Sequence, residues 1–235
     1  MLPGKGLLLP IQQAFIAAFA GLADQETFYL AGGTALAEYY LGHRLSFGLH
    51  FFTAEGSLVL PFSHQVETLG RAHDFSVTPL RRFAAYAEFL VAGLGETLKV
   101  ELAQDSPFRF HSPVDTETGI RVNNLLDLEV DKLLAYYGRA EPRDAVDLYF
   151  ILQREPVEHM LELASQKDPG FDLYWFAVAL NRAANFPDEL ERWPVRLIRE
   201  FEPTLLKSQF RELALWIMSG VTAKRPDTAG SSSKR

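Results

Sequence analysis

The spacing of the apolar residues along this chain is mixed up to about residue 104 and wholly helical after about residue 124, with the boundary in between. Before that boundary, helical stretches are mixed with segments in which apolar and polar residues alternate as they do in β-strands, for example at Leu98, Val100 and Leu102. After it, apolar residues recur every three or four positions, as in amphipathic helices. Strands and helices that are segregated along a chain are typical of an α+β fold. We therefore predict a small mixed sheet with helices, followed by a helical C-terminal half.

The same change defines the expected domains. We predict an α/β core over residues 1–119 and a helical domain over residues 120–220, separated by a loop that contains proline, serine and aspartate. Residues 221–235 form a mostly polar tail, which we predict to be disordered. With 235 residues, 48% of them hydrophobic, the chain can bury a core of this size.

Composition excludes several classes of function. There is no cysteine, so disulfides, thiolate nucleophiles and cysteine-ligated zinc sites are excluded. A formal charge of −7 argues against sequence-independent coating of nucleic acid, although a local basic patch for RNA remains open. No apolar run reaches the ~20 residues needed to span a bilayer. Ile11, Phe15 and Phe19 recur at helical spacing, so the first run is expected to be an amphipathic helix of a cytoplasmic protein.

Two glycines, Gly32 and Gly33, separate a short apolar strand from a helix that Thr34 is expected to cap. Glycines at such a junction let backbone N–H groups approach a phosphate closely, and the helix N-terminus favours the anion. A tight strand–helix turn is the structural alternative. On the glycine pair alone, that alternative is the preferred interpretation.

Four segments, taken together, point to one family. They are "LAGGTALA", "GHRLSFGLHFF", "LKVELA" and "DLEVDKLLAYYGRAEPRDAVDLYFIL", and with their flanks they cover residues 10–155. In content, order and spacing they resemble the AbiEii-type nucleotidyltransferase family of bacterial toxins, whose fold is that of polymerase-beta-like nucleotidyltransferases. The resemblance implies transfer of a nucleoside monophosphate from a nucleoside triphosphate (NTP) to an RNA, such as tRNA, or to a protein. It also implies Mg²⁺ as a cofactor and a cognate antitoxin as a partner.

The first family motif, G-G-T-A-L-A, is followed by H-R-x-S-x-D-[LIV]-D-F-F. The resemblance assigns nucleotide binding to the matching residues Gly32, Gly33, Thr34, Arg44 and Ser46. The two aspartates fall on Gly48 and His50, so both metal positions are degenerate. Carboxylates at positions i and i+2 of a strand face the same way and can share Mg²⁺, and neither carboxylate is present here.

His50 has two interpretations. Imidazole suits Zn²⁺, Mn²⁺ or Ni²⁺ better than Mg²⁺, so His50 is a candidate ligand for such an ion. The preferred alternative is an inward-facing polar residue that is hydrogen-bonded to a neighbour. Glu55, in a predicted turn five residues further on, is a candidate substitute for the missing carboxylates.

The remaining motifs supply further candidates. Lys99 and Glu101 match K-x-[DE] on one strand face, and the resemblance makes Glu101 the third metal-binding and catalytic carboxylate and Lys99 a phosphate contact. A solvated lysine–glutamate pair is the alternative. A helical lysine followed by R-D-x-x-D matches Lys132 and Asp147, which the resemblance places in the active site. A lysine in this position can neutralise triphosphate charge. Asp147 alternatively pairs with Arg143 across one helical turn.

Three hypotheses follow: a working nucleotidyltransferase, a nucleotide-binding pseudoenzyme of the same fold, and an interaction module in which residues 156–220 bind a partner protein. Losing even one electrostatic contact to a developing charge costs roughly 10²–10³-fold in rate. The absence of two metal carboxylates therefore favours weak or no transfer activity.

Overall fold

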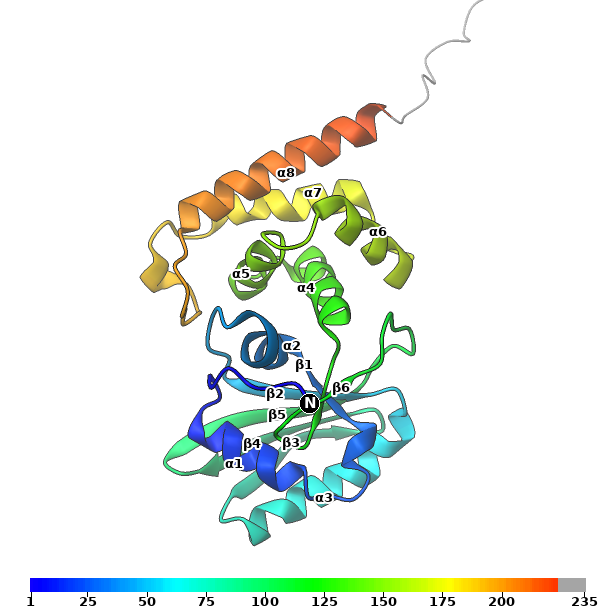
Figure 1. Cartoon of the computed structure of the whole chain (residues 1–235), viewed down its shortest axis with the longest axis vertical. Coiled ribbons are helices and arrows are strands. Elements are labelled where there is room, and N and C mark those ends of the chain that lie inside the picture. The colour runs from blue at the N-terminus through cyan, green and yellow to red at the C-terminus, as the bar shows by residue number, and fades with distance from the viewer. Residues whose placement is uncertain (224–235) are drawn as a thin grey trace, which may run out of the picture.

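A seven-stranded mixed sheet forms the centre of the N-terminal half (Figure 1). The structure is a computed structural model and describes residues 1–223. In spatial order the strands are β3 (Ser76–Phe83), β4 (Tyr86–Gly93), β5 (Glu96–Gln104), β2 (Gly48–Thr53), β1 (Tyr29–Ala31), β7 (Arg121–Val122) and β6 (Val114–Asp115). Strand β2 runs parallel to β5 and β1 runs parallel to β7, whereas the other neighbouring strands are antiparallel.

Helices α1 (Pro10–Phe19) and α3 (Val59–Ala72) cover one face of the sheet (Figure 1). Strand β2 alternates accordingly: Leu49 and Phe51 are buried, while Gly48, His50 and Phe52 are only partly buried. The ring of Phe51 stacks on that of Phe19 from α1, with 4.0 Å between the ring centres. Alternation on the strand therefore leaves Gly48 and His50 on the opposite face.

That opposite face is turned toward the helices of the second half (Figure 1). Helix α2 (Gly32–Ala35) contacts β1 and β2 and continues directly as the π-helical segment η2 (Leu36–Leu41). The helices that follow are α4 (Leu125–Arg139), α5 (Pro142–Ile151), α6 (Val157–Lys167), α7 (Leu173–Asn181) and α8 (Pro203–Ala223). Helix α4 contacts α2, α5, α6 and α7, and α7 packs along α8 at the far end of the molecule. Short 3₁₀ turns complete the chain: η1 (Gln25–Thr27), η3 (Gly56–Leu58), η4 (Arg182–Asn185) and η5 (Leu190–Arg192).

The predicted α+β class, with a small mixed sheet and a helical second half, is confirmed. Strands β6 and β7 pair with each other, so the sheet extends to Val122, just past the domain boundary predicted at residue 119. The start of the predicted tail falls in α8, which ends at Ala223, and the rest of that tail lies outside the described residues. Thr34 is not the helix cap, because α2 begins at Gly32 with Ala31 in the capping position.

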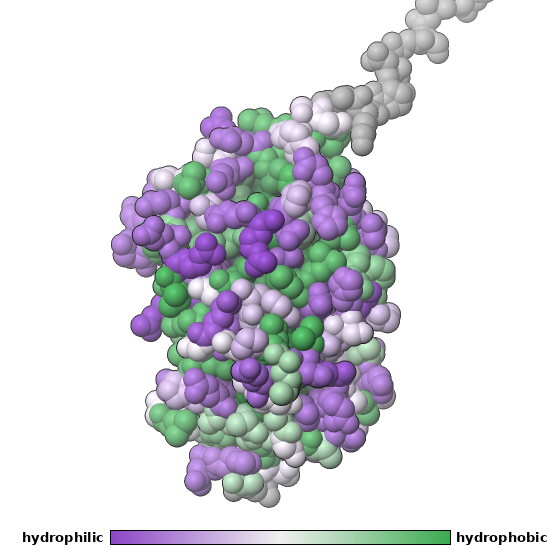
Figure 2. Space-filling view, in the orientation of Figure 1, coloured by the Kyte–Doolittle hydropathy of each residue, from purple (hydrophilic) through white to green (hydrophobic). Residues whose placement is uncertain are grey.

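On the face shown in Figure 2, hydrophilic side chains are spread over the sheet half and the helical half alike, with apolar side chains between them. Among residues 1–223, none of the helices combines the length and the apolar character that a membrane crossing requires.

Candidate functional site

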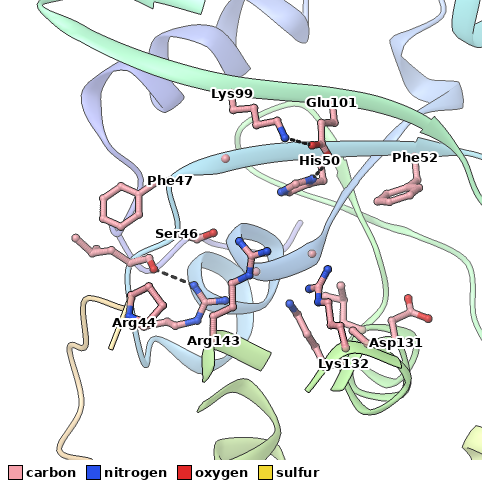
Figure 3. A pocket seen from close by; sticks show the side chains of 18 residues that line it. Arg44, Ser46, Phe47, His50, Phe52, Lys99, Glu101, Asp131, Lys132 and Arg143 are labelled. Carbon is pink, nitrogen blue, oxygen red and sulfur yellow. Dashed lines mark hydrogen bonds and ion pairs between the residues drawn. The ribbon is translucent and has the colours of Figure 1, made fainter. Parts of the chain in front are cut away.

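A pocket of about 590 Å³ lies between the open face of β2 and β5 and the helices α4 and α5 (Figure 3). Nine of the eleven residues predicted for the site line it: Gly32, Gly33, Arg44, Ser46, Gly48, His50, Lys99, Glu101 and Lys132. Thr34 and Asp147 are not among the lining residues. The pocket also includes side chains that the motifs did not assign to the site, among them Phe47, Phe52, Asp131, Arg139 and Arg143.

The sheet wall of the pocket is a row of charged side chains on adjacent strands. In the sheet register, His50 on β2 lies opposite Glu101 on β5, which lies opposite Glu88 on β4. His50 Nδ1 is 2.6 Å from Glu101 Oε2, and Lys99 Nζ lies 2.7 Å from both Glu101 Oε1 and Glu88 Oε1. Both oxygens of Glu101 are therefore engaged. Glu88 is buried, and its one sequence signal is that it is the sole charged residue in an apolar strand.

These contacts determine the protonation states of Glu101 and Lys99. The hydrogen bond from His50, reinforced by Lys99, lowers the pKa of Glu101 to about 2 even though burial opposes the shift. The hydrogen bonds to Glu101 and Glu88 raise the pKa of Lys99. At neutral pH Glu101 is a carboxylate and Lys99 an ammonium group.

Beneath the pocket, Asp147 is fully buried, and its carboxylate is bound by three side chains. Its Oδ1 lies 2.7 Å from His43 Nε2 and 2.6 Å from Arg44 Nε, and its Oδ2 lies 2.8 Å from an Arg44 terminal nitrogen and 2.9 Å from Lys132 Nζ. Although burial alone would raise the pKa of Asp147, the charges of Arg44 and Lys132 and the hydrogen bond from His43 hold it well below its ordinary value. Asp147 does not pair with Arg143. We call Asp147, His43, Arg44 and Lys132 the Asp147 cluster.

The cluster joins the two halves of the molecule. Asp147 belongs to α5, while His43 and Arg44 precede β2. The backbone around the cluster is also bonded to the segment between α7 and α8. The His43 carbonyl accepts a hydrogen bond from the Ile198 N–H at 2.9 Å, and the Leu45 N–H donates to the Arg196 carbonyl at 2.8 Å. Burial lowers the pKa of His43, so its neutral ring donates to Asp147 from Nε2.

The glycine motif is shaped by its neighbours. Gly32 has φ +70°, a left-handed conformation that favours glycine. A Cβ atom on Gly33 would stand 2.4 Å from a terminal nitrogen of Arg44. That guanidinium group cannot easily yield because it is bound to Asp147. The hydroxyl of Thr34 donates to the carbonyl of Gly48, so Thr34 ties α2 to the start of β2 rather than facing the pocket.

The helical wall is rich in cations. Lys132 is nearly buried, and Arg143 is half-exposed, with one terminal nitrogen 2.8 Å from Glu141. In total, five cationic side chains and two carboxylates line the pocket: Arg44, Lys99, Lys132, Arg139 and Arg143, against Glu101 and Asp131. These five cations gather at one pocket although the whole chain carries a formal charge of −7, and each of them is ion-paired with a carboxylate. A polyanion that binds here must share or replace those carboxylates.

The side chains at the expected metal position do not fit Mg²⁺. Magnesium prefers about six oxygen ligands in octahedral geometry. Gly48 offers no side-chain oxygen, and Glu101 is bound to Lys99 and His50. Glu55 is exposed and does not line the pocket. Within residues 1–223, no group of three or more histidine, aspartate or glutamate side chains is placed to hold a metal ion.

Comparison with known proteins agrees with the expected fold. The family model of the nucleotidyl transferase AbiEii toxin, of type IV toxin–antitoxin systems, matches residues 14–214. None of the curated proteins matches the sequence significantly. Similar solved structures include a putative nucleotidyltransferase from Helicobacter pylori (18% identity, 91% of this chain and 94% of that chain covered, TM-score 0.60).

Two more solved structures share the fold. JHP933 from Helicobacter pylori has 18% identity and a TM-score of 0.59, with 90% of each chain covered. MenT4, a nucleotidyltransferase toxin from Mycobacterium tuberculosis H37Rv, has 17% identity and a TM-score of 0.56, with 88% of this chain and 82% of that chain covered.

Proposed function

Because this chain belongs to the AbiEii nucleotidyltransferase toxin family, we propose that its pocket binds an NTP while the metal-dependent transfer reaction is lost or strongly weakened. One observation carries the proposal. The two β2 positions that match the aspartates of the family, Gly48 and His50, line the pocket without providing a carboxylate, whereas the cationic lining of the pocket is retained. Nucleotidyltransferases usually use an NTP together with a divalent metal ion. This site lacks the ligands for the metal ion.

Electrostatics supports the binding of a triphosphate. Lys132 and Arg44 are held in place from behind by Asp147, so their orientation costs little entropy when a ligand binds. Arg143 and Glu141 form a half-exposed pair, and such surface pairs contribute only ~0–1 kcal/mol. A phosphate oxygen can therefore replace Glu141 at Arg143 with little loss. Phe47 and Phe52 give the pocket two aromatic side chains against which a base can pack.

The test is label transfer from an NTP labelled at the α-phosphate to tRNA, or to protein, in the presence of Mg²⁺. The unmodified protein is compared with the double variant Gly48→Asp, His50→Asp. We expect the Mg²⁺-dependent part of the transfer, measured as the difference between Mg²⁺ and EDTA, to be near background for the unmodified protein and to rise in the double variant. Both positions must change together, because a Cβ on residue 48 would lie 3.2 Å from His50 Nε2. Robust Mg²⁺-dependent transfer by the unmodified protein would contradict the proposal.

A second candidate function is binding of an antitoxin protein through the helical half. Helices α7 and α8 pack together and expose large aromatic side chains, with Trp175 58% and Trp216 47% exposed. Exposed aromatic residues of this size are enriched in protein interfaces. Co-purification with the product of a neighbouring regulator gene tests this function. It should be lost in Trp175→Ala with Trp216→Ala, whereas Arg192→Ala, an exposed control, should leave it intact.

A further inference from the structure

The two residues that replace the expected aspartates fit each other. A Cβ atom on Gly48 would lie 3.2 Å from His50 Nε2, and one on Gly32 would lie 3.3 Å from His50 Cδ2. Both distances are tighter than ordinary van der Waals contact. The imidazole ring of His50 therefore lies in a slot between two glycines, and a side chain at either position would crowd it.

A hydrogen bond to Glu101 fixes the orientation of the His50 ring. Its Nδ1 lies 2.6 Å from Glu101 Oε2, and the other oxygen of Glu101 lies 2.7 Å from the ammonium group of Lys99, so the carboxylate accepts the hydrogen bond from Nδ1–H. Glu101 is in turn held by Lys99, which also binds the buried Glu88 on the next strand. A histidine whose Nδ1–H is bound to a carboxylate has its Nε2 lone pair available.

The other side of the ring is open. His50 lines the pocket, and its side chain is 33% exposed. Among the described residues, Nε2 makes no hydrogen bond. Figure 3 shows the imidazole on the sheet wall with Glu101 behind it, on the opposite wall from Lys132 and Arg143. The pocket therefore presents an oriented proton acceptor on one wall and phosphate-binding cations on the other.

We propose that His50 and Glu101 form a catalytic dyad, in which His50 Nε2 is the general base for attack of a hydroxyl group on the α-phosphorus of a bound NTP, without a metal ion. The inference rests on the proposed binding of an NTP in this pocket. A bond forms between the hydroxyl oxygen and the α-phosphorus as the bond from that phosphorus to the bridging oxygen breaks. Pyrophosphate leaves with the electron pair, and the hydroxyl proton passes to His50 Nε2. With water as the attacking molecule, the products are a nucleoside monophosphate and pyrophosphate.

Each residue then has one role. Glu101 orients the ring and stabilises the imidazolium ion that forms when His50 takes the proton. Lys99 is a positioning residue, because it holds Glu101 through its second oxygen. Lys132 and Arg143 face the charge that develops on the leaving pyrophosphate. A positioned general base contributes roughly 10²–10⁴-fold to a rate.

The experiment follows pyrophosphate release from each of the four ribonucleoside triphosphates by the full-length protein in EDTA. Isothermal titration calorimetry of the same triphosphates with the same samples measures binding separately. The variants are His50→Ala, Glu101→Gln and, as a matched control, His64→Ala, because His64 is an exposed histidine that does not line the pocket. We expect His50→Ala to lower the rate by roughly 10²-fold or more while NTP binding changes little. Free imidazole should restore part of the rate of His50→Ala, and His64→Ala should behave as the unmodified protein.

The possible failures are distinguishable. If calorimetry shows NTP binding but the unmodified protein releases no pyrophosphate in EDTA, the dyad is overturned and the proposed binding function stands. If calorimetry shows no NTP binding, the proposed function is overturned and the dyad with it. Equal rates for His50→Ala and the unmodified protein would also overturn the dyad.

Nitrogen NMR of the histidine side chains gives a readout that needs no turnover. The dyad requires His50 to carry its proton on Nδ1, with Nε2 unprotonated in the neutral ring. The Nε2–H tautomer would overturn the assignment, and it is readily distinguished by its two nitrogen shifts. In Glu101→Gln, the preference for the Nδ1–H form should weaken because the neutral amide is a poorer acceptor than the carboxylate.

Discussion

Two carboxylates predicted for the active site, Glu101 and Asp147, have opposite surroundings. Both are bound by histidine and lysine side chains. Asp147, however, is fully buried, and its partners Arg44, His43 and Lys132 come from both halves of the chain. Glu101 is partly exposed, at 18% of its side chain, and its histidine keeps one ring nitrogen open to the pocket. We infer that Asp147 holds the two walls of the site together, whereas Glu101 orients His50 and leaves the second ring nitrogen of that histidine open to the pocket.

The largest expected effect is a loss of folding stability when Asp147 is replaced. Asp147→Asn removes the charge that compensates the buried Arg44 and Lys132. Breaking a buried ion pair on one side costs about 3–5 kcal/mol in the free energy of unfolding. Glu101→Gln, which affects a partly exposed carboxylate, should cost clearly less. Urea denaturation of both variants checks the order, and equal losses would contradict the assignment of Asp147 as structural.

The second prediction tests whether the Asp147 cluster determines how closely Gly33 packs against Arg44. In Gly33→Ala the new methyl group would meet an Arg44 nitrogen at 2.4 Å, and Arg44 cannot move without leaving Asp147. Overpacking of this kind costs about 1–3 kcal/mol. The matched control is Gly138→Ala on the exposed side of α4, where no atom lies within 4 Å. It should raise the free energy of unfolding by about 0.5–1 kcal/mol. If both variants behaved alike in thermal denaturation, the close packing at Gly33 would be disproved.

The third prediction compares the pH dependence of two carboxyl groups. Glu129 on α4 is buried with one unbonded oxygen, and burial raises its pKa to about 7. Because its folded-state pKa lies above the ordinary 4.5, the native state binds this proton more tightly than the unfolded state does. Its contribution to stability is therefore full below about pH 4.5 and falls as the pH rises through about 7. Glu129→Gln should remove this fall, which denaturation midpoints between pH 4 and pH 8 would measure.

Glu101 should show the reverse dependence, with a smaller effect because it is partly exposed. Its pKa is lowered to about 2, so the unfolded state binds its proton more tightly. The stability it contributes is present above about pH 4.5 and is lost as the pH falls toward about 2. The difference in stability between the unmodified protein and Glu101→Gln should shrink over that range. A difference that stays constant with pH would mean that His50 and Lys99 do not stabilise the ionised form.

Local patterns, together with the resemblance to the family, predicted much of the lining of the pocket. Alternation placed Lys99 and Glu101 on one strand face, and the glycine pair with the flanking motifs placed Gly32, Gly33, Arg44 and Ser46 near them. The placement of Lys99 and Glu101 depends on the two-residue period of a strand, whereas that of Gly32, Gly33, Arg44 and Ser46 depends on the resemblance to the family motif.

What the sequence did not reveal depends on contacts between distant segments. Glu88 joins the site through the register of β4 with β5, which no local pattern determines. Asp147 turns away from the pocket because α5 packs on Arg44, 103 residues earlier in the chain. Thr34 was predicted as a helix cap, but its hydroxyl bonds the carbonyl of Gly48 on the neighbouring strand. In each case tertiary packing decides the role of the side chain.

We propose that the pocket binds an NTP through its own cations rather than through a metal held at Gly48 and His50. Isothermal titration calorimetry of ATP, GTP, CTP and UTP, in EDTA and again in Mg²⁺, tests it most directly. We predict measurable binding of at least one NTP, with dissociation constants in the two conditions within about threefold, a difference of less than 1 kcal/mol. Binding that appears only with Mg²⁺, or no binding in either condition, would contradict the account.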